Sequence, residues 1–182
     1  MQTSFSNALT SKPYFLGQIL DTSLTQVDSY AAETAISFGQ PVQLGTDPTK
    51  QVKALVAGGS LWGIAIESNF AVAGGVLSTN TTTEQVVNVT SNNTHTYPIG
   101  SMVPVVKVGR VVIQVGATVS QSTVGKTQAW YQTASATASS IGTIRASDSD
   151  PGNGSTEIFI SIGTFFSVPT ANNLAVIQIN KL

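Results

Sequence analysis

Short runs of apolar, often β-branched residues, separated by glycine, proline and asparagine, recur along most of this 182-residue chain. In residues 61–66 and 158–162 the apolar side chains alternate with others at a period of two, which is the pattern of a strand with one buried face. No segment of ten residues has the apolar spacing of an amphipathic helix. The sequence therefore predicts an all-β fold, either an antiparallel β-barrel or a jelly-roll-like sandwich.

The clearest local pattern lies in residues 102–119. If Gly109 and Arg110 form a two-residue turn, with the glycine first as a type II′ turn prefers, Val108 faces Val111 across a hairpin. Pro104 then faces Val115, and one whole face of the hairpin is apolar. We predict a hairpin here. A single strand that bends at Gly109 fits the same residues and is the alternative.

The length suggests one domain, or one domain with extended ends. Residues 1–16 are polar with isolated aromatic side chains, which indicates an extended N-terminal arm or, alternatively, a disordered tail. We expect the β domain in residues 17–167 and a last strand or an arm in residues 168–182. Around residues 28–35 the residues fit either one helical turn or a pair of short strands.

Charged residues make up only 9% of the chain, against about 25% in ordinary soluble domains. So few charges give a free monomer little protection against association, which favours a surface covered by neighbouring subunits. An adhesin-like extracellular protein is the alternative for such a Ser/Thr/Asn-rich surface. The net charge is −1 and the basic residues are scattered, so no stripe is present to bind nucleic acid directly.

The first residues lack the basic and apolar regions of a secretion signal, and no apolar run reaches the length of a membrane span. We therefore expect synthesis in a cytoplasm and no membrane association. The chain has no cysteine and a single histidine, His95, which disfavours disulfides and zinc sites. We expect no cofactor and no metal.

Two motifs imitate ligand sites. Residues 120–127 resemble a phosphate-binding loop, but Ser120 replaces its first glycine and the residues that follow are strand-like. Asp148 and Asp150 are placed as in a calcium loop, but Glu157 has the wrong spacing to complete one. His95 has no nucleophile motif around it. We predict a turn and a solvated loop, with no catalytic residues. An enzyme would require distant acidic residues to converge in a cleft.

Aromatic side chains are the candidate contacts, because they dominate interface hot spots. Trp62 lies in the alternating run of residues 61–66 and is expected in the core, whereas Trp130 and Tyr131 fit the core or a contact patch equally well. The candidate contacts with a partner protein or a neighbouring subunit are Phe5, Lys12, Tyr14, Phe15, Trp130 and Tyr131.

An ordered series of residues resembles the phage structural cement, or capsid decoration, family. The series covers roughly residues 12 to 165, and its specificity comes from order and spacing. It comprises Tyr14, Gly17-Gln18-Ile19, Asp21, Val27-Asp28-Ser29, Glu33, Ile36, Phe38-Gly39, Pro41-Val42, Gly45-Thr46-Asp47-Pro48, Leu61-Trp62-Gly63-Ile64-Ala65, Tyr97, Gly100, Met102-Val103-Pro104-Val105, Gly109-Arg110-Val111, Val115-Gly116-Ala117-Thr118-Val119 and Val124. The Thr/Asn-rich residues 78–96 and the tail after Ser167 depart from it.

The resemblance implies a β-barrel or jelly-roll-like subunit on the outer surface of a capsid. Such subunits form homo-oligomers at local symmetry axes, bridge neighbouring major capsid proteins and resist the pressure of the packaged DNA. We expect a trimer ahead of a dimer. The alternative is another virion part, a fibre or baseplate tip that binds a receptor or a carbohydrate.

Overall fold

Strands of very different lengths build the fold, and no helix is present among the residues described. The structure is a computed structural model that describes residues 16–67, 96–116, 124–135, 141–148, 157–170 and 173–179, with the backbone alone for 21–24. The all-β prediction is confirmed. The strands are β1 (Ile19–Ala32), β2 (Ile36–Ser37), β3 (Pro41–Leu44), β4 (Gln51–Ala54), β5 (Gly63–Ala65), β6 (Thr96–Tyr97), β7 (Met102–Gln114), β8 (Gln128–Ala134), β9 (Ile144–Arg145), β10 (Ile158–Phe165) and β11 (Leu174–Ile179).

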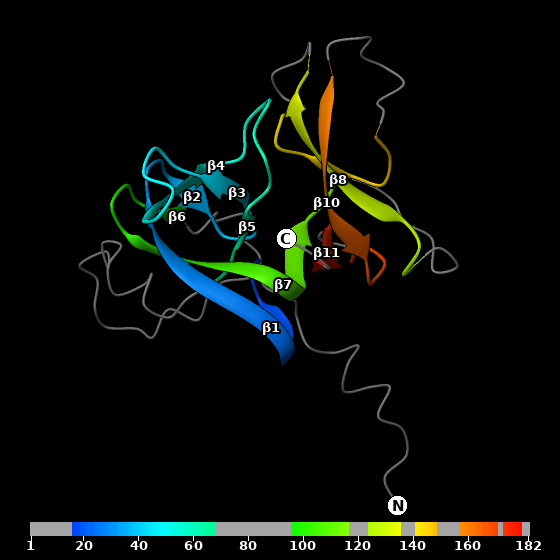
Figure 1. The fold of residues 1–182 in the computed structure, drawn as a ribbon. Coiled ribbons are helices and arrows are strands. Elements are labelled where there is room, and N and C mark those ends of the chain that lie inside the picture. The colour runs from blue at the N-terminus through cyan, green and yellow to red at the C-terminus, as the bar shows by residue number, and fades with distance from the viewer. Residues whose placement is uncertain are drawn as a thin grey trace, which may run out of the picture.

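One nine-stranded sheet has the order β1-β4-β3-β5-β7-β11-β10-β8-β9, and β2 pairs with β6 in a second, small sheet. Strand β1 also pairs with β7, so the pairings β1-β4-β3-β5-β7 close into a ring. Figure 1 shows the ring strands on one side of β7 and strands β8 to β11 on the other. Strand β7 therefore connects the two halves of the molecule.

One pairing departs from the expected antiparallel sheet. Strands β1 and β4 run parallel, with Ala31 opposite Gln51 and Ala32 opposite Val52, so the sheet is mixed. The remaining pairings of the described strands are antiparallel. The finer prediction, a barrel or a jelly-roll-like sandwich, stays a prediction.

The predicted hairpin at Gly109 and Arg110 is wrong, because β7 runs through both residues as one strand. Its first half pairs with β1 and β5, and its second half pairs with β11, from Gln114 opposite Leu174 to Gly109 opposite Ile179. Neighbouring strands, rather than a second half folded back, thus cover the valines of the period-two pattern. Gly109 has φ 136°, and a Cβ there would lie 2.8 Å from the Thr25 hydroxyl oxygen, so the bend requires glycine.

The region where a helical turn or a pair of short strands was expected belongs mainly to one strand, because β1 continues to Ala32. The register of β1 against β7 shifts at three places between Ile19 and Val27. Such bulges interrupt the alternation of side chains along a strand. The sequence pattern of β1 therefore does not indicate one long strand.

Two apolar clusters form the core, and β7 contributes to both. Val103 and Val105 lie in the cluster of the ring, and Val106, Val111 and Ile113 lie in the cluster shared with β8 to β11. Alternation places the neighbours Val105 and Val106 in different clusters. Val111 and Ile113 have the same parity as Val105 but lie in the other cluster, so the bend at Gly109 also contributes to this division. The C-terminal strand β11 is buried between β7 and β10, so the tail of the chain completes the centre of the sheet.

Candidate functional site

A lysine on β7 packs against two aromatic rings that lie beside the core of the ring of strands. The ammonium of Lys107, on β7, lies 4.0 Å from the centre of the Trp62 ring and 5.7 Å from that of Tyr30. The two rings meet edge to face, with centres 6.3 Å apart and planes at 78°. Lys107 also forms an ion pair with Asp28 at 2.5 Å. We call these four residues, Asp28, Tyr30, Trp62 and Lys107, the lysine cluster.

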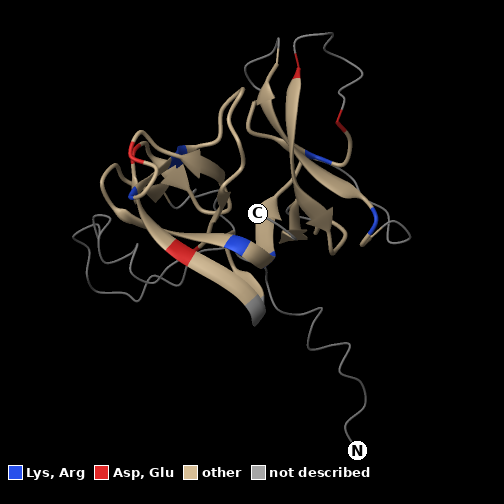
Figure 2. Cartoon of the chain, viewed as in Figure 1, with Lys and Arg blue, Asp and Glu red and all other residues tan. Residues whose placement is uncertain are grey.

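The sheet register brings the lysine cluster together. Asp28 lies opposite Val105, and Tyr30 lies opposite Val103. The side chains of these two residue pairs are therefore on one face of the β1–β7 ladder. Lys107 is two residues beyond Val105 and therefore points to the same face. The two valines are buried in the core of the ring, and Tyr30 and Trp62 pack against that core. Figure 2 shows the acidic segment of β1 close to this stretch of β7.

Burial and charge within the lysine cluster act in opposite directions. Burial disfavours the charged ammonium of Lys107, but hydrogen bonds to Asp28 and Tyr30 and their charges outweigh it and raise the pKa of Lys107 above its ordinary value. The lysine side chain is 12% exposed, and that of Asp28 is 38% exposed. The cluster therefore presents its carboxylate, rather than its cation, to solvent.

The indole N–H of Trp62 is buried and has no hydrogen-bond partner within the part of the chain that the structure describes. Trp62 was expected in the core together with Ile64 and Ile66. Those two isoleucines lie in the cluster shared with β8 to β11, whereas Trp62 precedes β5 and packs half-buried against the other cluster. Partly exposed tryptophan and tyrosine beside a charge are typical of protein contact sites.

A second cation lies on an aromatic ring at the bend of β7. The guanidinium carbon of Arg110 is 3.7 Å from the centre of the Phe166 ring, and its Nε donates a hydrogen bond to Gln178 Oε1 at 3.3 Å. The Phe166 side chain is 42% exposed. This stack joins the end of β10 to β7 and β11, and it leaves one ring face at the surface.

Large apolar side chains are also exposed at the turn that leads into β7. Ile99 is 72% exposed and Met102 is 65% exposed, and Pro98 beside them is exposed as well. Val27 on β1 is 39% exposed. Single exposed apolar residues are normal, but these lie on β1, on β7 and in the turn that precedes β7, and β1 and β7 also carry three residues of the lysine cluster.

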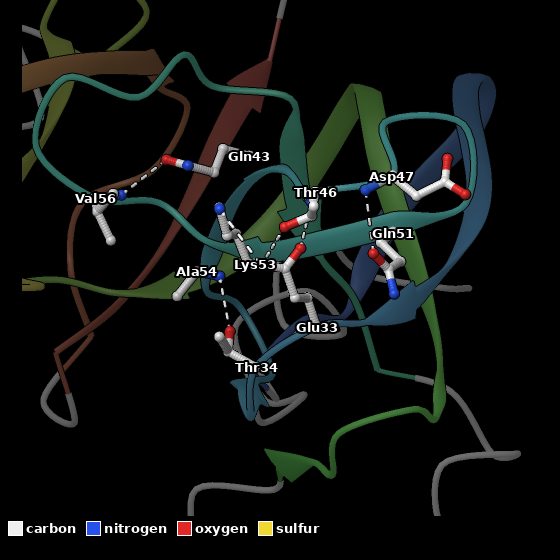
Figure 3. A network of polar contacts seen from close by, with 9 residues as sticks. All are labelled: Glu33, Thr34, Gln43, Thr46, Asp47, Gln51, Lys53, Ala54 and Val56. Carbon is white, nitrogen blue, oxygen red and sulfur yellow. Dashed lines mark hydrogen bonds and ion pairs between the residues drawn. The ribbon is translucent and has the colours of Figure 1, made fainter.

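A network of polar contacts holds the turn between β3 and β4 against the end of β1 (Figure 3). The Glu33 carboxylate accepts hydrogen bonds from the backbone N–H and the hydroxyl of Thr46, and it pairs with Lys53 at 3.4 Å. The backbone hydrogen bond is the main reason that the pKa of Glu33 lies below its ordinary value. A hydrogen bond from the Thr49 hydroxyl likewise lowers the pKa of Asp47. These carboxylates are engaged in structure and do not form a catalytic pair.

The predicted contact residues have different positions. Phe5, Lys12, Tyr14 and Phe15 lie outside the described residues, and so does His95. Trp130 and Tyr131 are neighbours on β8. Trp130 is half-buried, whereas Tyr131 is 4% exposed and belongs to the core, where burial raises the pKa of its hydroxyl. The contact role of all six residues stays a prediction.

The motifs that imitate ligand sites show no ligand-binding geometry in their described parts. Residues 124–127 form a turn that leads into β8, so no helix follows the imitation of a phosphate-binding loop. No acidic residue lines the shallow pocket between the turn after β2 and strands β8 and β9, which includes Phe38, Gln40, Gln114, Tyr131 and Ile144. The described residues contain no group of three potential metal ligands.

No helix among the described residues is long and apolar enough to cross a membrane.

Comparison with known proteins places the chain in a class. Residues 1–180 match the family described as "Structural cement protein (E217 gp24/Pam3 gp6)". A chain of the solved structure titled "The capsid of Myoviridae Phage XM1" has a similar fold, with a TM-score of 0.56 at 14% sequence identity over 98% of each chain. No curated protein matches.

The class is that of bacteriophage structural proteins. Because the match extends over essentially the whole chain, this protein belongs to the family of phage structural cement proteins. The resemblance expected from the ordered series is thereby confirmed.

The sequence did not indicate the lysine cluster as a unit. Its members come from β1, the segment before β5, and β7. The pairing of β7 with β1 and with β5 brings them together. The one local signal was the pairing of an aromatic residue with an acidic one two positions earlier, Asp28 and Tyr30, which is too common to predict a site.

Proposed function

We propose that the protein binds the outer face of a phage capsid and clamps neighbouring major capsid proteins, so that the shell resists the pressure of the packaged DNA. The observation that carries this proposal is the family match over residues 1–180. The fold shared with a chain of a phage capsid structure supports it, although at 14% identity that likeness concerns the fold alone. The role is structural and non-enzymatic.

The chemistry of the chain suits a protein that is covered by neighbours. Charged residues are 9% of the sequence, so little charge must be desolvated when two surfaces meet. Exposed apolar side chains such as Ile99 and Met102, and the half-buried rings of the lysine cluster, provide contact area. These features support assembly on a shell without identifying the face that binds.

We further propose that the subunit acts as a homo-oligomer, a trimer ahead of a dimer, with the closed ring of strands as its small barrel. An oligomer engages several capsid subunits at once, so contacts of modest strength gain from high effective concentration. Residues 1–16 act as an arm that adds to the sheet edge of a partner. The candidate contacts in this segment are Phe5, Lys12, Tyr14 and Phe15.

Cosedimentation with undecorated, expanded capsids of the source phage tests the proposal. We expect saturable binding at a fixed ratio to the capsid protein, together with greater resistance of the capsids to heat. The ratio also reports whether each site holds two or three copies. A folded protein that fails to bind would sink the proposed function.

A further inference from the structure

One side of β1 lacks a neighbouring strand along most of its length. Strand β7 pairs with one side from Ile19 to Ala31, whereas β4 pairs with the other side at Ala31 and Ala32 alone. No other described strand pairs with β1. Below Ala31, the side away from β7 is therefore an open sheet edge within the described part of the chain.

The register identifies the backbone groups on this edge. Ser29 lies opposite Pro104, which has no N–H, and the Pro104 carbonyl accepts a hydrogen bond from Ile66 on its other side at 3.0 Å. The Ser29–Pro104 pair is thus not a hydrogen-bonded pair, and the N–H and C=O of Ser29 point away from β7. Ala31, two residues on, points the same way and donates to the Lys50 carbonyl at 2.7 Å. By the same alternation, Val27 points to the open edge.

This edge has few of the features that prevent an exposed edge strand from pairing with another chain. Residues 19–32 contain no lysine, arginine or proline, the residues that usually protect an edge. Val27 and Ser29 are exposed, and Val27 offers an apolar side chain beside its open backbone groups. The bulges of β1 lie between Ile19 and Val27, so residues 27–30 remain in regular register. Such an edge suits the addition of an extended segment from a partner.

The charges indicate which partner fits. An antiparallel pairing with β1 of a second copy that satisfies Val27 and Ser29 of both copies would place the two Asp28 residues directly opposite each other. Like charges in that position are destabilising. The Asp28 side chain is 38% exposed, whereas its partner Lys107 is 12% exposed, so a strand added here meets a carboxylate. A segment with a lysine or arginine opposite Asp28 is complementary.

We propose that the open edge of β1 at Val27 and Ser29 receives an extended segment of a major capsid protein as an added strand, with a basic residue opposite Asp28. This rests on the proposed capsid-binding function and adds the element that makes the contact. The subunit would then be joined to the shell by backbone hydrogen bonds as well as by side chains.

Substitution of Ser29 by proline tests the edge. S29P removes the N–H that points outward and places a ring in the path of an added strand, while the ladder with β7 does not use this N–H. The matched control is S29A, which loses the hydroxyl and keeps the N–H. We expect S29P to weaken binding to undecorated capsids at least tenfold, and S29A to bind within about twofold of the wild type, since one hydrogen bond and a steric clash together exceed 1.4 kcal/mol.

Amide hydrogen exchange of the wild-type protein gives a second readout that does not depend on how well S29P folds. We expect the amides of Val27 and Ser29 to exchange at least tenfold more slowly on capsids than in the unbound protein. Equal exchange in the two states, or equal binding by folded S29P and wild type, would overturn the edge proposal while leaving the cement function in place. Protection that rises with concentration in the unbound protein would assign the edge to a second copy and overturn it too. A wild-type protein that binds no capsids overturns both proposals.

Discussion

At the scale of single residues, Lys107 shows how a chain with few charges uses one of them. Its ammonium is nearly buried, and it is held by the faces of Trp62 and Tyr30 and by the carboxylate of Asp28. A buried cation is tolerated only where such partners replace water. An apolar residue in place of Lys107 would leave the Asp28 carboxylate without this ion-pair partner.

Replacing Lys107 with methionine keeps the length of the side chain and removes the charge. We expect K107M to lower the free energy of unfolding by about 1–2 kcal/mol, mainly through the lost cation–π contacts, because solvent screens the ion pair at the 38% exposed Asp28. Urea unfolding measures the difference. The matched control is K126M, at an exposed lysine, which should change stability by less than about 0.5 kcal/mol. A K107M variant as stable as the wild type would show that the cluster adds nothing to folding.

Glu33 gives a prediction about pH. Its pKa in the folded protein is lowered, chiefly by the backbone hydrogen bond from Thr46, so its ionised form stabilises the fold. That contribution is present above the ordinary pKa of 4.5 and is lost as the pH falls through the lower pKa of the folded state. The wild type should therefore exceed E33Q in stability at pH 7, and this advantage should be smaller at pH 3.

Urea midpoints at the two pH values measure the effect. The control is Q43L, which removes the acceptor for the Val56 N–H in the same network but titrates nothing, so its effect should be equal at both pH values. An E33Q difference that is unchanged between pH 7 and pH 3 would contradict the assigned role of the carboxylate.

At the scale of elements, β5 is a short strand of three residues that is packed closely between β3 and β7. A Cβ on Gly63 would lie 2.5 Å from a methyl group of Val105 and 2.5 Å from the Val106 carbonyl oxygen. We expect G63A to lower the free energy of unfolding by about 3 kcal/mol, because β5 cannot move away without breaking the ring. The control is G116A, whose Cβ would have its nearest neighbours at 3.8 Å. Equal stability of the two variants in urea would refute this tight packing.

Strands β8, β9 and the start of β10 depend on one buried amide. Gln132 Oε1 accepts hydrogen bonds from the Thr143 hydroxyl and Arg145 Nε, both at 3.1 Å, and its Nε2 donates to Glu157 at 3.2 Å. We expect Q132L to lower the free energy of unfolding by about 2–3 kcal/mol, because Thr143, Arg145 and Glu157 each lose a hydrogen-bond partner at a buried position. Q128L, at an exposed glutamine of the same strand, is the control. A Q132L variant with the urea midpoint of Q128L would contradict this.

The elements also show what the sequence could predict. The alternation of apolar residues in the sequence correctly predicted a strand at residues 158–162, although its burial does not alternate, since Ile158 is 44% exposed and Ile162 is buried. It also indicated that the valines of β7 lie in extended chain, and burial does not alternate there either. The hairpin at Gly109 failed because the same alternation serves a bent strand whose neighbours, β1 and β11, are distant in sequence. The lysine cluster was missed for the same reason: register across strands, rather than any local pattern, brings Lys107 to Trp62.

At the scale of the whole molecule, β7 binds the two halves together. It belongs to the ring through β1 and β5, and to the second half through β11, so both apolar clusters include its side chains. A subunit built in this way transmits load between contacts on either half through a continuous ladder of backbone hydrogen bonds. That property agrees with the proposed role of a clamp, which must hold separate capsid subunits at a fixed distance.

The proposed role also makes the N-terminal segment separable from the fold. Because the first described strand, β1, begins at Ile19, deleting residues 1–12 removes Phe5 and Lys12 and leaves every strand that the structure describes. We expect the truncated protein to keep the wild-type urea midpoint and to bind undecorated capsids at least tenfold more weakly, since the proposed arm contributes its contacts to the shell. Replacing residues 2–12 with a Gly/Ser tract of equal length is the control for chain length, and it should bind as weakly as the deletion. Full occupancy of capsids by the truncated protein would mean that the clamp lies in the sheet, where the edge of β1 is the surface to test next.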